Sequence, residues 1–482
     1  MDRVSANPSS LVGYHLLITK SSSNLRIRQN KLFIEAEIFA AGQDVISAFL
    51  KHRHKDQHDW VEIPMIEIGD DRWRSSFRVE RLGTYIYTLE AWINPFLTWH
   101  KKLQQKLRAG ACLAHDLANM IRLLEKTARS ASIVDSNRLQ EFMTLCDSEA
   151  HISILLENSG LRDEINEVLT RYRDPATATQ FEPEFRVVVD PVLARFGAWY
   201  EVFPRSCSQE VGCHGTLMDL ADRLPLLANL GFDVVYIPPI HPIGHTARKG
   251  RNNSRLAQPG DLGSPWAVGA KEGGHKSIHP RLGTMDDFAV LLSRAQELGI
   301  QIAMDIALQC SPDHPYLDQH AEWFRRRADG SIQFAEDPPQ SYEDIYPFDF
   351  ECRDWRDLWA ELGSIFTFWI DRGVTVFRVD NPHTKPLDFW EWLIDDLKSR
   401  APNLIFLAEG LTRPSIMMQL ARVGFSQSYD YFPWRNTKVE IASYYAFLTQ
   451  SDVREFFRPN LWINTPQFLP EALQKGGGVR HS

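Results

Sequence analysis

The stretch GVTVFRVDNPHTKP, residues 373–386, decides which fold this chain adopts. It starts as a run of apolar and β-branched residues, Val374 to Val379, of the kind that forms a strand buried on both faces. Around the end of that strand come residues that are costly to bury, namely Arg378, Asp380, Asn381, His383 and Lys385. Polar residues at the carboxyl end of a buried parallel strand are typical of barrel enzymes. The stretch therefore predicts a parallel sheet with a functional site at its carboxyl edge.

The sequence around this stretch alternates between strand and helix from residue 195 onward. This alternation favours a parallel sheet covered on both faces, in the form of a (β/α)8-type (TIM) barrel. Seven strands are expected, in GAWYEVF, DVVYIPPI, IQIAMDIAL, VTVFRVD, NLIFLAE, FSQSYDYF and LWINTP. We predict an incomplete catalytic barrel over residues 195–482, without its last strand, with long loops at 238–284 and 308–350.

The residues before this barrel predict a separate β domain with a helical insertion. Residues 1–98 contain KLFIEAEIFA, which alternates apolar and acidic side chains, and the aromatic-rich GTYIYTLEAWI, so we expect a β-sandwich. Residues 99–172 contain no proline and carry one apolar helical face, made by Leu113, Leu117, Met120, Ile121 and Leu124. We expect residues 173–194, with the strand-like FRVVVDP, to return to the sandwich and lead into the barrel.

Composition excludes several classes of protein. The 482 residues are 44% hydrophobic and 24% charged, which fits a globular protein of two or three domains. A net charge of −9 without a long basic run argues against nucleic acid as a partner, and no apolar run is long enough for a membrane span. The start of the chain lacks the pattern of a secretory signal, and the six cysteines lack metal-ligand spacing. We expect a cytoplasmic protein with no metal and no cofactor.

Three carboxylates follow predicted strands: Asp305, Asp380 and Glu409. The last two end adjacent strands, so they can meet in one pocket, and a pair about 5–5.5 Å apart is the arrangement of a retaining glycosyl-transferring site. One carboxylate would attack the anomeric carbon while the other works as acid and then base. Arg378, two residues before Asp380 on the same strand face, would keep the nucleophile ionised. Taken singly, each could instead be a helix cap or part of a salt bridge.

Several motifs resemble glycoside hydrolase family 13, the α-amylase clan: FRVDNPHTKP, LAEGLTRP and INTP. A narrower resemblance, to the bacterial α-1,4-glucan:maltose-1-phosphate maltosyltransferases, rests on PPIHPIGHTARKGRNNS, GSPWAVGAKEGGHKSIHPRLGT, DIALQCSPDHPYL, SYEDIYPFDF and GFSQSYDYFPWRNTK. This resemblance implies transfer of maltosyl units from α-maltose 1-phosphate to the non-reducing end of an α-1,4-glucan, with retention and release of phosphate. It also implies a homodimer formed through the N-terminal and helical domains.

The resemblance also implies a role for individual residues. Asp380 would be the nucleophile and Glu409 the general acid and base. The residues that would bind the substrate are Lys249, Gln309, Tyr342, Asp344, Arg378 and Asn381. A lysine suits a phosphate, and amide and carboxylate groups suit sugar hydroxyls. For Lys249 the alternative is a solvated loop lysine, and for His383 and Lys385 it is structural hydrogen bonding after the strand.

The sequence departs from the family pattern at three places. The motif NTPQ has Gln467 where the family has the aspartate that stabilises the transition state, so a charge is lost there. Asp337 stands where the family commonly has asparagine, and the chain stops before the expected eighth strand and C-terminal β domain. These departures favour, as the alternative, a catalytically impaired or inactive glucan-binding and dimerising relative, from a truncated or decayed gene or with its remainder encoded separately. An amylase-type hydrolase is a third and less favoured reading.

Overall fold

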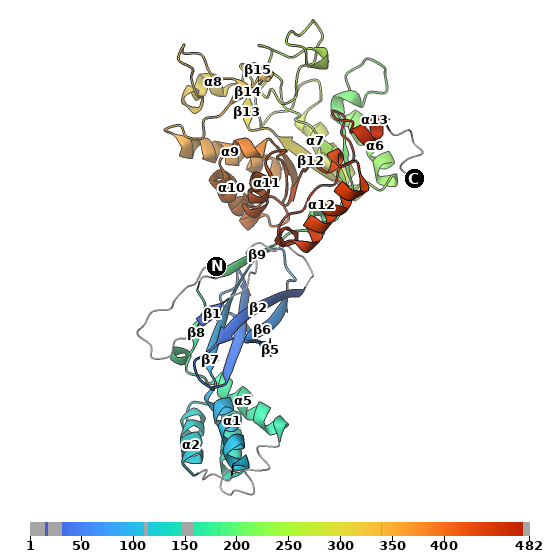
Figure 1. The fold of residues 1–482 in the computed structure, drawn as a ribbon. Coiled ribbons are helices and arrows are strands. Elements are labelled where there is room, and N and C mark those ends of the chain that lie inside the picture. The colour runs from blue at the N-terminus through green and yellow to red at the C-terminus, as the bar shows by residue number, and fades with distance from the viewer. Residues whose placement is uncertain are drawn as a thin grey trace. The chain divides into compact units, whose positions relative to one another are not determined.

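The computed structural model describes residues 15–17, 31–109, 114–145, 158–182, 184–338 and 340–475. These residues form two compact units (Figure 1). The main segments of the first unit are Gln29–Glu80 and Thr84–Val187, and the main segment of the second is Val188–Ser482. Leu113, two of the cysteines and the side chain of Asp337, all named above, lie outside the described residues.

The first unit is built on two antiparallel sheets. One has the order β1-β2-β6-β5, from strands His15–Leu17, Lys31–Phe39, Arg72–Arg78 and Ile66–Gly69. The other has the order β4-β3-β7-β8, from Val61–Pro64, Ile46–His54, Gly83–Ile93 and Thr179–Gln180, and β9 (Phe185–Val189) also pairs with β7. His52 of β3 stacks on Phe77 of β6 with 4.2 Å between ring centroids, so the sheets pack face to face. In β2 every second side chain is buried, at Leu32, Ile34, Ala36 and Ile38, which confirms the predicted half-buried strand.

Four described helices lie between β7 and β8: α1 (Pro95–Arg108), α2 (Ala114–Ala128), α3 (Ile133–Leu145) and α5 (Ser159–Arg171). Asn94 fixes the start of α1, because its side chain accepts a hydrogen bond of 2.9 Å from the backbone N–H of Leu97. The helices share a core that includes Phe96, Leu103, Met120, Leu124, Leu139 and Ile165. The predicted β domain with a helical insertion is confirmed, while the division at residues 98, 172 and 194 stays a prediction.

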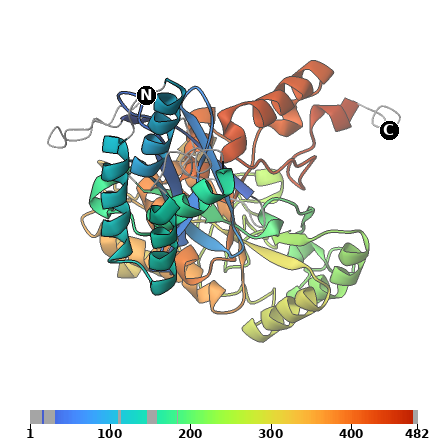
Figure 2. The same cartoon turned by 90° about the horizontal axis from the view of Figure 1, so that it is seen from below.

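The second unit is built on a parallel sheet of six strands in the order β10-β11-β12-β17-β18-β19. These are Trp199–Glu201, Val234–Ile237, Gln301–Ile306, Val376–Asp380, Ile405–Glu409 and Gln427–Ser428. The helices along it are α6 (Leu217–Asn229), α7 (Met285–Glu297), α9 (Trp355–Ile370), α10 (Leu387–Arg400), α11 (Pro414–Arg422), α12 (Lys438–Gln450) and α13 (Glu471–Lys475). Helices α6 and α7 lie side by side, in green and yellow-green in Figure 2. The predicted parallel sheet of the barrel type is confirmed, and its six described strands form a half-barrel.

The predicted seventh strand, LWINTP, is wrong. Residues 461–466 are not a strand, and pairing with β19 is limited to a single bridge between Ser428 and Pro459. The physical reason lies in β19, which ends at Ser428 and turns into the short helix Phe432–Trp434, so it offers no further backbone to pair with. The alternating apolar residues of this segment are left exposed, at 40% for Leu461 and 64% for Ile463.

The loop after β12 carries more structure than the sequence predicted. It contains a short helix, α8 (Tyr316–Gln319), and two small antiparallel sheets of two strands each. One pairs β13 (Gln309–Cys310) with β16 (Tyr346–Pro347), and the other pairs β14 (Ala335–Asp337) with β15 (Gln340–Tyr342). Together with the loop after β11, it stands above the carboxyl edge of the sheet (Figure 1). Among the described helices, none is long and apolar enough to cross a membrane.

Candidate active site

The register of the sheet brings the predicted carboxylates together. In the ladder between β17 and β18, Asp380 pairs with Glu409, and in the ladder between β12 and β17, Asp305 pairs with Arg378. The three strands run parallel, so all four side chains gather near one edge of the sheet. The sequence predicted this neighbourhood from the strand ends alone.

Arg378 is the centre of this cluster. Its Nη1 lies 2.9 Å from Asp305 Oδ2 and 2.8 Å from Asp380 Oδ1, and its Nη2 lies 3.7 Å from Glu409 Oε2. Burial opposes the charge of the guanidinium, but the carboxylates, Asp305 foremost, outweigh it and hold the pKa of Arg378 well above its usual value. One buried cation is therefore shared by three acids.

Both oxygens of Asp380 have a hydrogen-bond donor. Arg378 donates to Oδ1, and the side-chain amide of Asn381 donates to Oδ2 at 3.2 Å. Asn381 itself has left-handed backbone angles, φ 45° and ψ 50°, which asparagine tolerates better than most residues. This turn also directs the Asn381 backbone N–H to Glu409 Oε2 at 3.1 Å. The two donors thus hold the Asp380 carboxylate in one orientation, as an attacking group requires.

Glu409 has a different environment from Asp380. Burial raises the pKa of Glu409, while the charge of Arg378 and the backbone N–H of Asn381 act against this rise. A carboxyl group with a raised pKa suits proton donation near neutral pH. Lys385 lies close by and donates to the backbone carbonyls of Asp380 and Asn381, at 3.4 and 3.0 Å. These hydrogen bonds fit a structural role after the strand, which was the alternative named for Lys385 above. Burial lowers the pKa of Lys385 to about 8.

Asp305 is enclosed beneath the site. Its Oδ2 accepts hydrogen bonds from the hydroxyl of Tyr236 at 2.6 Å, from Trp266 Nε1 at 3.1 Å and from Arg378. Burial raises the pKa of Asp305, and its side chain is fully buried. Asp305 therefore holds Arg378 in position and is not accessible to a substrate. Tyr236 and Trp266 were missed by the sequence reasoning, although a tyrosine inside an otherwise apolar strand was a signal that its hydroxyl has a partner.

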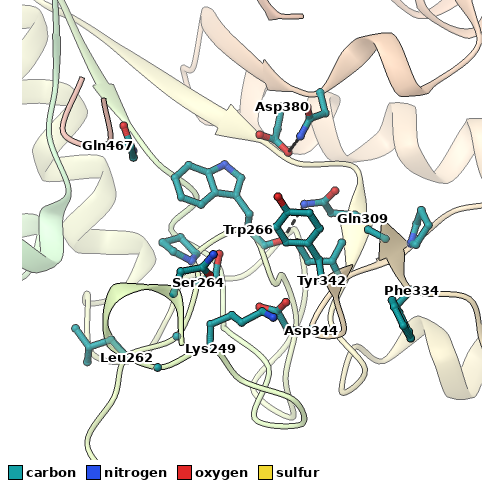
Figure 3. Close-up of a pocket in the computed structure, with 18 of the residues that line it drawn as sticks. Lys249, Leu262, Ser264, Trp266, Gln309, Phe334, Tyr342, Asp344, Asp380 and Gln467 are labelled. Carbon is teal, nitrogen blue, oxygen red and sulfur yellow. Dashed lines mark hydrogen bonds between the residues drawn. The ribbon is translucent and has the colours of Figure 1, made fainter. Parts of the chain in front are cut away.

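A large cavity of about 1570 Å³ opens over this edge (Figure 3). It is lined by most of the predicted site residues: Lys249, Gln309, Tyr342, Asp344, Asp380, Asn381 and Gln467. Arg378 and Glu409 are connected to it through Asp380 and Asn381, which they contact. Segments far apart in the sequence thus supply one cavity.

The side of the cavity away from Asp380 carries a basic and an acidic side chain, Lys249 and Asp344. Lys249 lies alongside Asp344 in Figure 3 and forms an ion pair with Glu343, Nζ to Oε2 at 3.0 Å. Asp344 is 2% exposed, and neither of its carboxylate oxygens accepts a hydrogen bond from another residue. Burial raises the pKa of Asp344, and the charge of Lys249 opposes this rise. Lys249 is 5% exposed, so it is not the solvated loop lysine of the alternative reading.

The remaining polar groups are held by neighbours. Gln309 Nε2 donates to the backbone carbonyl of Trp266 at 3.2 Å, and the hydroxyl of Tyr342 donates to Gln340 Oε1 at 2.5 Å. Gln467 Nε2 donates to Glu201 Oε1 at 2.8 Å. Glu201, at the end of the first strand β10, was not predicted from the sequence, and burial raises its pKa. The described residues contain no group of three or more possible metal ligands.

Two family models match parts of this chain. Residues 25–191 match the family model described as alpha-1,4-glucan:maltose-1-phosphate maltosyltransferase, domain N/S, and residues 199–359 match the alpha-amylase catalytic domain. An alpha-amylase structure from Lactobacillus plantarum is 26% identical, with a TM-score of 0.42 over 55% of this chain and 58% of that one.

Two curated relatives carry the name alpha-1,4-glucan:maltose-1-phosphate maltosyltransferase. The protein from Chlorobaculum tepidum is 46% identical over 94% of this chain and 68% of its own length. The protein from Methylacidiphilum infernorum is 47% identical over 93% of this chain and 67% of its own length. The chain spans about two thirds of the length of these relatives. On this similarity the chain belongs to the α-1,4-glucan:maltose-1-phosphate maltosyltransferase family.

Proposed function

We propose that this protein transfers maltosyl units from α-maltose 1-phosphate to the non-reducing end of α-1,4-glucans and releases phosphate, with retention of configuration. The observation that carries the mechanism is the pair Asp380 and Glu409, which are register partners on adjacent strands and differ in environment. Asp380 accepts two side-chain hydrogen bonds, one of them from Arg378, whereas burial raises the pKa of Glu409. Such a division separates a nucleophile from an acid.

The proposed reaction has two steps. Asp380 attacks the anomeric carbon, the bond to the phosphate oxygen breaks, and Glu409 gives its proton to the departing phosphate. The 4-hydroxyl of the acceptor then loses its proton to Glu409 and displaces Asp380 from the same carbon. Two inversions give net retention.

The cavity supplies the groups that this donor needs. Lys249 would balance the charge of the phosphate, and Gln309, Tyr342 and Asp344 would bind sugar hydroxyls. The unpaired carboxylate of Asp344 supports this assignment, because a buried acceptor without a donor is costly unless a ligand provides one. We also propose a cytoplasmic location, as expected from the sequence, and a homodimer through the first unit, as the family resemblance implies.

One assay tests the function directly. The purified chain is incubated with α-maltose 1-phosphate and maltohexaose, and both released phosphate and acceptor length are measured. We expect one phosphate for each maltosyl unit gained by the acceptor. Phosphate release with free maltose and no lengthening would show a hydrolase instead. Binding of donor without release of phosphate would show the inactive, glucan-binding alternative, which Gln467 favours.

The pair Gln467 and Glu201 gives a prediction about turnover. A carboxylate at position 467 would interact with positive charge on the sugar that is greatest in the transition state. Gln467→Asp alone would place that carboxylate against Glu201, whose hydrogen-bond donor it removes. We therefore expect the double variant Gln467→Asp with Glu201→Gln to raise kcat at least about tenfold, with a smaller change in KM. Steady-state phosphate release measures this, and equal kcat in the wild type and the double variant would contradict it.

A further inference from the structure

A second cavity of about 350 Å³ opens beside the catalytic cavity, between the loops that follow β10 and β11. We call it the arginine pocket, and its charged and imidazole groups include Arg205, His214, Arg248, Glu272, His279 and Arg281. Three of these, Arg205, His214 and Arg281, line the catalytic cavity as well. The rest of the wall is largely proline and other apolar residues, such as Phe203 and Leu262.

The three arginines of this pocket form no ion pair with any described carboxylate. Arg205 gives one hydrogen bond of 2.9 Å to the backbone carbonyl of Gly263, and burial lowers its pKa with no carboxylate opposing the shift. Arg248 donates to the backbone carbonyls of Gly244 and Ile243, which fixes its position without neutralising its charge. Arg205 and Arg248 are half-buried, and half-buried cations without anionic partners are costly. Arg281 is exposed and lines the same cavity, so the three arginines together favour an anionic ligand.

The two histidines add adaptable polar groups to the same cavity. Their rings stack with centroids 6.0 Å apart. His279 Nδ1 accepts a hydrogen bond from the backbone N–H of Arg281, which leaves Nε2 as the donor in the neutral ring. Burial lowers the pKa of His279 to about 4, and repulsion from His214, Arg248 and Arg281 adds to this. The excess of positive charge around the pocket therefore also acts on the histidines, because it lowers the pKa of His279.

Two carboxylates line the pocket and oppose this surplus. Asp261 is engaged elsewhere, because it accepts a hydrogen bond from the backbone of Gln258 and pairs with Arg251. Glu272 is exposed and forms no ion pair within the part of the chain that the structure describes. Glu272 is therefore the lining group that would repel an anion most.

We propose that the arginine pocket binds a phosphate group, carried either by inorganic phosphate or by a phosphorylated sugar. Guanidinium groups bind phosphate through parallel hydrogen bonds, and Arg205 and Arg281 have N–H groups available for this. The pocket volume suits a ligand of this size. Two of its arginines also line the catalytic cavity, so the pocket would bind phosphate beside the proposed donor site. Lys249 would then remain available for the phosphate of the donor.

The test measures binding of inorganic phosphate by calorimetry, without donor or acceptor, so its outcome is independent of the proposed transfer reaction. Lys249→Gln serves as the background, since it weakens any phosphate site in the catalytic cavity. On that background we expect phosphate still to bind. Adding Arg281→Gln should weaken the phosphate affinity about tenfold or more, and adding Glu272→Gln should strengthen it severalfold. Arg353→Gln, an exposed arginine outside both cavities, should change nothing.

Opposite effects of two exposed residues cannot come from misfolding, so each variant checks the other. Arg205→Gln with Arg281→Gln should remove binding altogether. Loss of all phosphate binding in Lys249→Gln, or equal affinities for Arg281→Gln, Glu272→Gln and the background, would overturn the proposal. Glucose 1-phosphate, titrated in parallel, separates the two sources: tighter binding than inorganic phosphate assigns the pocket to a sugar phosphate, and equal or weaker binding assigns it to phosphate itself.

Discussion

Asp380→Asn is expected to abolish maltosyl transfer while the protein stays folded. Asparagine is nearly isosteric and can keep an oxygen facing Arg378, but it cannot form the glycosyl ester that the proposed mechanism needs. Removing a covalent nucleophile commonly lowers kcat by on the order of 10⁴-fold or more. Phosphate release from α-maltose 1-phosphate should therefore fall to background.

The control for this variant is Asp349→Asn. Asp349 also pairs with an arginine, Arg325 at 2.9 Å, but it does not line the catalytic cavity. We expect full activity from Asp349→Asn and an unchanged melting temperature for both variants. Transfer at the wild-type rate by Asp380→Asn would remove Asp380 from the mechanism.

The neighbourhood of the catalytic residues could be predicted because it depends on local rules. A polar residue that ends a buried parallel strand lies at the carboxyl edge, so Asp305, Asp380 and Glu409 were expected near one another. The spacing of Arg378 and Asp380 by two residues placed both on one strand face. Whether Asp305 would reach the cavity could not be predicted, since that depends on the Tyr236 and Trp266 side chains that cover it.

Long-range pairing explains what the sequence could not provide. The hydrogen bond between Gln467 and Glu201 joins residues 266 positions apart, and neither residue has a local pattern that signals the other. The segment LWINTP has the alternation of a strand, yet a strand exists only where a neighbour offers free backbone groups. Its neighbour β19 ends at Ser428, and this ending is not visible in the sequence of 461–466 itself.

Arg378→Met should destabilise the second unit strongly. The change leaves Asp305, Asp380 and Glu409 close together and buried without their shared cation. Breaking a buried ion pair on one side costs about 3–5 kcal/mol of unfolding free energy. By comparison, Arg325→Met removes an arginine whose side chain is 58% exposed and should cost at most about 1 kcal/mol. Urea denaturation of both variants measures this difference.

The pH dependence of Arg378→Met distinguishes loss of charge compensation from loss of packing. Burial already raises the pKa of Asp305 above its ordinary value, and without Arg378 the rise is larger. A carboxyl group whose pKa is higher in the folded protein than in the unfolded chain supports the fold when protonated, and that support is lost as pH rises. Arg378→Met should therefore lose more stability relative to the wild type at pH 8 than at pH 5. Adding Asp305→Asn, which removes one of the stranded charges, should recover part of the stability at pH 8. A deficit that is the same at both pH values, and unchanged by Asp305→Asn, would mean that Arg378 stabilises the site by packing alone.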